Sequence, residues 1–166
     1  CKPGGWVART RGCPSPLYGA LVNHLLLPIT LTSTGAAGLL NVWLAVRCGR
    51  VRAASGGGLG HLDNDLLLAR SRSHSNFAEY TPIVLMLIAA IELGEGSSYW
   101  LAGVSAAFLL GRIAHPLGME GKLAQGRFIG TILALLITLG LGLYALSLPL
   151  RAASAVNAAQ TGVGAG

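Results

Sequence analysis

The sequence predicts an all-α membrane protein in which four transmembrane helices form a single bundle. Of its 166 residues, 52% are hydrophobic and only 11% are charged, and its mean hydropathy is +0.60. An average soluble domain carries about 25% charged residues. The apolar residues also fall into four runs, and ~20 such residues cross a bilayer as a helix. We therefore expect a membrane domain at residues 21–150, with helices at about 21–46, 66–93, 99–117 and 127–148.

The two ends of the chain lack these apolar runs. Residues 1–20 are rich in glycine and proline and show no sustained periodicity, so we expect a flexible leader there. Residues 151–166 consist mainly of small and amide residues, a composition typical of disorder. We expect a disordered tail at this end.

The first predicted helix carries a polar residue well inside its span. Pro28 fits the start of the helix or a kink in it. Asn41 needs a hydrogen-bond partner inside the membrane, and two are open: a neighbouring helix, or the same site as Glu79 of the second helix. A basic segment, residues 47–52, follows the apolar run and indicates that the helix ends there.

The second predicted helix brings a polar cluster into an apolar segment. At ~100° per residue, Arg72, Asn76 and Glu79 fall within about 60° of one another, and Tyr80 lies at the edge of that arc. His74 points away from it, toward solvent or lipid headgroups. Ionisable groups in a membrane helix are costly. The cluster therefore predicts a site for a ligand or a partner, and an interhelical network that only joins subunits is the alternative.

Helix starts and helix contacts also have signals in the sequence. Asp63 or Asp65 can cap the second helix, and Trp100 marks the membrane interface where the third begins. Gly126 and Gly130 form a G-x-x-x-G pattern at the start of the fourth helix. Such spacing is typical of two helices whose backbones approach closely.

The distribution of basic residues predicts the topology. Five lysines and arginines surround the connection between helices one and two, three surround that between helices three and four, and the connection between helices two and three has none. The positive-inside rule then puts both basic loops on the cytoplasmic side of a multi-pass protein, which we expect in a bacterial inner membrane. The basic residues form no patch interleaved with aromatic residues, so nucleic acid is not an expected partner.

The cysteines and histidines indicate no metal site. The three cysteines are an odd number without a C-x-x-C pair, and none has metal-ligand spacing to the four histidines. We expect neither a metal nor a disulfide framework.

The candidate site residues all fall near the same membrane boundary. Their charges are mostly positive, with one carboxylate among them, and this set suits a small anion that carries carboxylates and an ammonium group. From the four predicted helices in order, they are Arg47, with Arg50 as the alternative, then Arg72, Asn76, Glu79, Tyr80, Arg112, His115 and Arg127.

These residues resemble the signature of a known family. The pattern R-x-x-x-N-x-x-E-Y-x-P, which runs from Arg72 to Pro82, is similar to the second helix of the MAPEG proteins, membrane-associated proteins in eicosanoid and glutathione metabolism. The segment from Gly111 to His115 resembles the end of that family's third helix, especially in its prostaglandin E synthase branch and in small bacterial members. The likeness covers roughly residues 25–148.

The resemblance implies a homotrimer of four-helix subunits that binds glutathione between neighbouring subunits. Carried over by position, Arg127 would be the catalytic residue that stabilises the glutathione thiolate. The implied function is a glutathione-dependent transferase or peroxidase acting on lipophilic electrophiles, with lipid, glutathione, a lipophilic small molecule and further copies of the chain as partners. The glutathione-binding residues would be Arg47, Arg72, Asn76, Glu79, Tyr80, Arg112 and His115.

One departure from the family pattern leaves an alternative open. A tyrosine that the synthases carry one turn after the position of His115 is Met119 here, and Pro116 follows His115 directly. A methionine cannot donate a hydrogen bond to a sulfur or a carboxylate. The alternative function is a non-catalytic MAPEG-type protein, either a lipid-binding scaffold or an accessory subunit of a membrane complex.

Overall fold

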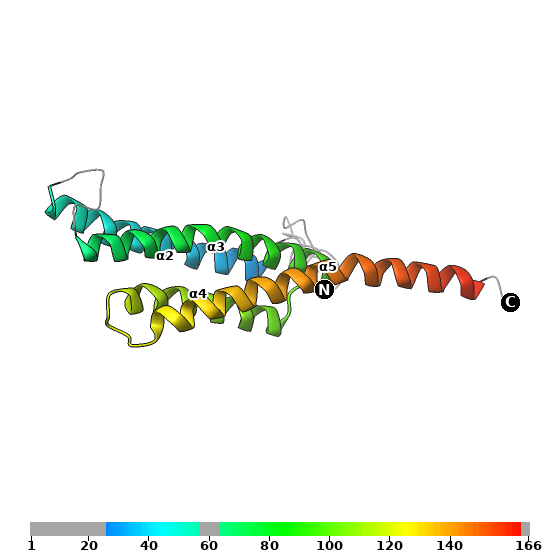
Figure 1. Cartoon of the computed structure of the whole chain (residues 1–166). Coiled ribbons are helices and arrows are strands. Elements are labelled where there is room, and N and C mark those ends of the chain that lie inside the picture. Colours follow the sequence, from blue (N-terminus) through cyan, green and yellow to red (C-terminus); the bar gives the residue numbers. More distant parts are fainter. Residues whose placement is uncertain (1–25, 57–63, 164–166) are drawn as a thin grey trace, which may run out of the picture.

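A computed structural model describes residues 26–56 and 64–163 and shows four long helices (Figure 1). All four are long and apolar enough to cross a membrane, and the described part of the chain contains no strand. The predicted all-α class and four-helix bundle are therefore confirmed, while the leader expected at residues 1–20 lies outside the described residues. The helices are α2 (Pro28–Ala54), α3 (Asp65–Glu95), α4 (Tyr99–Met119) and α5 (Gly126–Val163).

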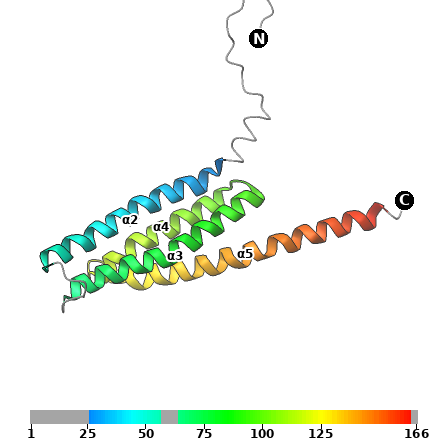
Figure 2. The same ribbon diagram turned by 90° about the horizontal axis from the view of Figure 1, so that it is seen from above.

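The helices run side by side, and the end of α2, the start of α3 and the connection from α4 to α5 lie at the same end of the bundle (Figure 2). We call this the basic end, because the arginines at the end of α2 and at the starts of α3 and α5 lie there. The connection from α3 to α4 lies at the opposite end, and α5 continues past it. The topology thus brings four helix ends together at the basic end.

Helix α2 begins under a cap that a different helix provides. Pro28 occupies its first turn, where no backbone donor is needed. The carboxylate of Glu92, near the end of α3, accepts hydrogen bonds from the backbone N–H groups of Ile29 (3.0 Å) and Thr30 (2.8 Å) and from the Thr30 hydroxyl (2.7 Å). Glu92 is 1% exposed. This carboxylate satisfies donors that the start of a helix leaves free.

Two other helix boundaries differ from the sequence expectation. Helix α2 continues to Ala54, beyond the predicted end at residue 46, since the basic segment is made of residues that tolerate a helix outside the hydrocarbon. The cap of α3 is Asn64, whose side chain accepts a hydrogen bond from Leu67 N at 3.0 Å. Of the two expected caps, Asp65 is the first residue of the helix and Asp63 lies outside the described residues.

The end of the chain differs most from the prediction. Helix α5 continues to Val163, where a disordered tail was expected over residues 151–166. The residues from Arg151 to Ala158 are exposed, so burial in the bundle does not account for their helical conformation. Alanine has the highest helix propensity, and the alanines of this segment extend the helix past Pro149.

Helices α4 and α5 approach most closely near the basic end, because glycines face each other there. A Cβ atom added to Gly130 would lie 2.6 Å from the carbonyl oxygen of Gly111 and 2.8 Å from Cβ of His115. One added to Gly126 would lie 2.5 Å from the carbonyl oxygen of Ala114. The close contact predicted from the G-x-x-x-G pattern is confirmed, and it fixes Arg112 and His115 against α5.

Candidate functional site

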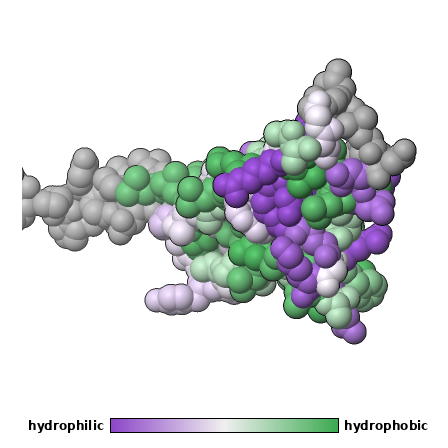
Figure 3. Space-filling model, turned by 90° about the vertical axis from the view of Figure 1, so that its left-hand side faces the viewer, coloured by the Kyte–Doolittle hydropathy of each residue, from purple (hydrophilic) through white to green (hydrophobic). Residues whose placement is uncertain are grey.

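A polar pocket of about 350 Å³ opens at the basic end, between α3, α4 and α5. Figure 3, which views the molecule from this end, shows hydrophilic side chains gathered there. The pocket is lined by Arg72, Ser75, Asn76, Glu79, His115, Met119, Arg127 and Thr131. Five of these residues were predicted as site residues from the sequence, and the structure brings them together.

The α3 side of the pocket follows directly from helix geometry. Arg72, Asn76 and Glu79 lie on one face of α3, as their spacing predicts. Arg72 and Glu79 are exposed and Asn76 is half-buried. The pocket thus offers a guanidinium, an amide and a carboxylate from a single helix.

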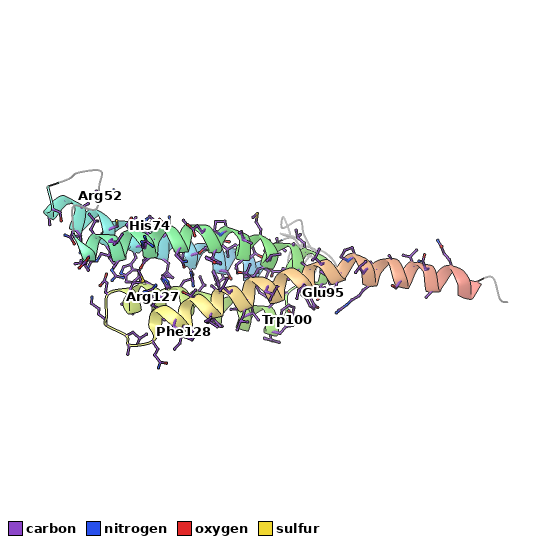
Figure 4. All side chains as sticks on the ribbon, in the orientation of Figure 1. Arg52, His74, Glu95, Trp100, Arg127 and Phe128 are labelled. Carbon is purple, nitrogen blue, oxygen red and sulfur yellow. The ribbon has the colours of Figure 1, made fainter. Side chains whose placement is uncertain are left out.

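Arg127 supplies the opposite side of the pocket from the first turn of α5. Figure 4 places it at the same end of the bundle as Arg52 and far from Glu95 and Trp100. It also borders a second hollow, of about 540 Å³, on the outer face of α5. Arg127 and Thr131 line both spaces, so the polar pocket and this outer hollow are adjacent.

Arg112 does not line the pocket but lies buried behind it, 2% exposed. Its guanidinium donates to Oδ1 of Asn76 at 2.6 Å and to the carbonyl oxygen of Gly130. A buried charge is costly unless its hydrogen bonds are satisfied. Among the described residues no carboxylate pairs with Arg112 and its buried Nε has no hydrogen-bond partner, so these two acceptors satisfy the guanidinium only in part. Arg112 is placed to orient Asn76.

Tyr80 also lies outside the pocket. It is half-buried and packs against the hydrophobic core, with its ring centroid 5.8 Å from the guanidinium carbon of Arg112. The ring of Phe108 lies at 5.6 Å from the same carbon. Aromatic faces stabilise a nearby guanidinium. Within one chain, Tyr80 therefore contacts Arg112 from the core side.

Arg47 is engaged elsewhere at the basic end. Its guanidinium forms an ion pair with Glu120, lies 4.2 Å from the ring centroid of Trp43, and does not line the pocket. Glu120 also pairs with Arg70 at 2.7 Å and with Lys122 at 3.1 Å. The alternative residue, Arg50, is exposed.

Glu120 is the residue that the sequence interpretation missed. Its side chain is 3% exposed, and it joins the connection between α4 and α5 to both α2 and α3. Burial alone raises the pKa of a carboxyl group, but hydrogen bonds from Lys122 and Arg70 and the charges of Arg47 and Arg70 lower the pKa of Glu120 below its usual value. The signal in the sequence was a single carboxylate in a basic region, which does not reveal its partners.

The structure also resolves the alternatives for Asn41. Its Oδ1 lies 2.9 Å from Nε2 of His74, so it bridges α2 and α3 and does not reach the pocket that contains Glu79. His74, which was expected to face solvent or headgroups, therefore also bonds to a neighbouring helix. This bridge gives each of the two polar side chains a hydrogen-bond partner on the other membrane helix.

The described residues contain no group of three or more histidine, cysteine or acidic side chains that could hold a metal ion. The pocket is instead a cationic and hydrogen-bonding site with one carboxylate. Such a composition fits an organic anion that also carries a positive group.

The fold and the site define a multi-pass membrane bundle with a polar pocket where its helix ends meet. Residues 30–147 match the model of the MAPEG family, and this match includes parts of all four helices. The chain belongs to the MAPEG family. Comparison with curated proteins and with solved structures gave no significant match. The family uses glutathione in general and includes glutathione transferases and peroxidases as well as non-catalytic members.

Proposed function

We propose that the protein binds glutathione in the polar pocket and joins its sulfur to lipophilic electrophiles. The observation that carries this proposal is the position of Glu79 in one pocket with Arg72 and Arg127. Glutathione has two carboxylates and one ammonium group, which these three side chains complement. The pocket volume, about 350 Å³, lies at the lower end of the range for small-molecule sites, about 300–1,000 Å³.

Asn76 has a defined role in this proposal. Because Arg112 donates to its Oδ1, the amide is fixed with Nδ2 free to donate to a ligand. His115 lines the same pocket from α4. Arg112 and Tyr80 then support binding through Asn76 and the core, while the other proposed residues contact the ligand.

Arg127 would serve the chemical step. A guanidinium near the sulfur lowers the pKa of the thiol, whose proton is lost to solvent. The thiolate then attacks an electrophilic carbon and forms a carbon–sulfur bond, while the bond to the leaving group breaks and that group departs with the bonding electrons, as halide does from an aryl halide. The outer hollow on α5 offers a route for that electrophile, because Phe128 is 69% exposed there and Ile132 is 39% exposed. A lipophilic molecule can therefore enter from the bilayer and meet the polar pocket at Arg127.

The proposed assembly is a homotrimer with glutathione between subunits and with the basic end on the cytoplasmic side of a bacterial inner membrane. Two observations support it. The pocket is lined by α3, α4 and α5 only, so α2 of a neighbouring copy could complete it. Arg47 lies outside the pocket of its own chain, so a contact between Arg47 and glutathione requires a glutathione molecule bound in the pocket of a neighbouring copy.

Calorimetric titration of the detergent-purified protein with glutathione tests the binding proposal. Arg72→Ala and Glu79→Gln are each expected to weaken binding about 10- to 100-fold, the range for a lost charge-assisted hydrogen bond. Arg151→Ala removes a charge at the far end of the molecule and is expected to leave the affinity unchanged. Unaltered affinity in both pocket variants would rule the proposal out.

A non-catalytic role is the second candidate, and Met119 favours it. Its thioether lines the pocket and cannot donate a hydrogen bond to a thiolate. Mass spectrometry after incubation with glutathione and an aryl halide separates the two candidates. Conjugate formation that requires Arg127 supports the transferase, whereas binding without turnover supports the scaffold or accessory subunit.

A further inference from the structure

One face of α2 changes from apolar to cationic along its length. Ala36, Leu40, Trp43, Arg47 and Arg50 recur at intervals of three or four residues, so they share a face of the helix. The apolar part lies toward the middle of the bundle, and the two arginines lie at the basic end. This order of groups matches that of a phospholipid, from acyl chain to headgroup.

The apolar part of this face borders a groove between α2 and α4. One hollow, of about 340 Å³, is lined by residues from Pro28 to Ala36 on α2 and from Ala102 to Leu109 on α4. A second, of about 400 Å³, lies between Ala36 and Trp43 on α2 and Ile113 on α4. Ala36 lines both hollows, so they form one groove.

The length of the groove suits one acyl chain. From Pro28 to Trp43 the helix rises about 22 Å at 1.5 Å per residue. One leaflet of a bilayer contributes about 15 Å of hydrocarbon, half of the ~30 Å core. A single chain that begins at the level of Trp43 therefore fits within the groove.

The basic end of the groove is suited to a phosphate. Trp43 is 38% exposed, and the guanidinium of Arg47 stacks on its ring. Nη1 of Arg47 is buried without a hydrogen-bond partner in the described structure, although Nη2 is bound to Glu120. Arg50 is exposed one turn further along. Tryptophan at the membrane interface with arginine beyond it is typical of the headgroup level.

We propose that the groove between α2 and α4 binds one anionic phospholipid, with an acyl chain along Ala36 and its phosphate against Arg47 and Arg50. The groove shares no lining residue with the polar pocket of the same chain, so the acyl chain lies apart from the proposed glutathione and electrophile sites there. Arg47 is common to this lipid site and to the glutathione contact proposed for a neighbouring copy. The net positive charge at the headgroup end selects an anionic lipid over a zwitterionic one. Each arginine is expected to contribute about fivefold to that preference.

Quenching of Trp43 fluorescence by lipids with brominated acyl chains tests the proposal. In full-length protein that carries Trp6→Phe and Trp100→Phe, Trp43 is the only remaining tryptophan of three. The protein is reconstituted in bilayers that contain brominated phosphatidylglycerol or, at the same mole fraction, brominated phosphatidylcholine. Brominated phosphatidylglycerol is expected to reach half-maximal quenching of Trp43 at a several-fold lower mole fraction than brominated phosphatidylcholine.

Two variants separate the headgroup from the chain. Arg50→Ala is expected to lower the preference for phosphatidylglycerol about fivefold, and Arg151→Ala, with the same loss of charge at the far end, to leave it unchanged. Ala36→Phe fills the junction of the two hollows and is expected to reduce quenching by both lipids.

The proposal is overturned if the two lipids quench Trp43 equally, if the preference for phosphatidylglycerol survives Arg50→Ala, or if Ala36→Phe leaves the quenching unchanged. Absence of quenching by either lipid would also overturn it, because another protein surface, such as a second copy of the chain, would then cover the groove. Glutathione titration of the same variants in detergent without phospholipid, where no lipid competes for Arg47, is independent of these outcomes.

Discussion

Replacement of Gly130 by alanine is expected to disturb the fold and the proposed site together. The added Cβ would lie 2.6 Å from the carbonyl oxygen of Gly111, 2.8 Å from Cβ of His115 and 3.1 Å from its Cα. Ordinary carbon–oxygen contacts need at least about 3.2 Å, since carbon pairs have their optimum near ~3.5–4.0 Å. The two helices must therefore separate by roughly half an ångström at this level.

The cost of this separation can be set against a known gain. Overpacking of a close contact costs about 1–3 kcal/mol, whereas a helical Gly→Ala change by itself stabilises by about 1 kcal/mol. Gly140→Ala provides the control, because a Cβ added there, also on α5, meets nothing within 4 Å. Each kcal/mol of lost stability lowers the melting temperature by ~2–4 °C. We therefore expect the melting temperature of Gly130→Ala to lie several degrees below that of Gly140→Ala.

Thermal unfolding in detergent, followed by circular dichroism, measures the difference between these variants. Glutathione titration of the same samples should show weaker binding by Gly130→Ala alone, because separation of α4 and α5 draws the Gly130 carbonyl away from Arg112 and displaces His115. If Gly130→Ala is as stable as Gly140→Ala and binds glutathione equally well, the close approach of the helices does not position the site.

Three further predictions concern single polar side chains. The fold lowers the pKa of Glu120 below its ordinary value of 4.5, so its ion pairs stabilise the protein fully above pH 4.5 and are lost as the pH falls through the lowered pKa. The difference in melting temperature between wild type and Glu120→Gln should therefore shrink as the pH falls through that range. Glu92→Ala should lower stability by about 1–3 kcal/mol, measured by denaturant unfolding, because it leaves donors of α2 unpaired. Arg112→Lys keeps the charge but cannot reproduce the fork of donors, so glutathione affinity should fall, while the matched Arg151→Lys change at the far end of the molecule retains it.

The polar face of α3 could be predicted from the sequence because it depends on one helix alone. Arg72, Asn76 and Glu79 are separated by four and three residues, and any regular helix brings them to one side. The glycines of α5 were also informative, since a close helix approach leaves a pattern of small residues. In both cases the physical cause lies within a short segment of the chain.

The separation of pocket residues from supporting residues could not be predicted in that way. Arg112 and His115 are one turn apart and looked equivalent, but only His115 lines the pocket. Arg112 is buried because the Gly130 carbonyl comes within its reach, which requires the position of α5. Glu120 likewise acquires its role from Arg47 and Arg70 on two other helices. Burial and partner choice at these positions are tertiary effects.

The ion pair of Arg47 with Glu120 constrains how the proposed trimer would use this arginine. Within one chain, the carboxylate of Glu120 accepts a hydrogen bond from Nη2 of Arg47 and also pairs with Arg70 and Lys122. The charge of Glu120 is therefore not neutralised by Arg47 alone. Nη1 has no partner. Because Nη1 is buried, a carboxylate or phosphate from outside the chain reaches it only when the guanidinium turns toward the surface. Glutathione in a neighbouring pocket and a phospholipid in the groove would then compete for the same donor. If they compete, the affinity for glutathione measured in bilayers should fall as the fraction of phosphatidylglycerol rises. Glu120→Gln removes the carboxylate that pairs with Nη2 of Arg47, so a second donor becomes available and the dependence of glutathione affinity on lipid should weaken.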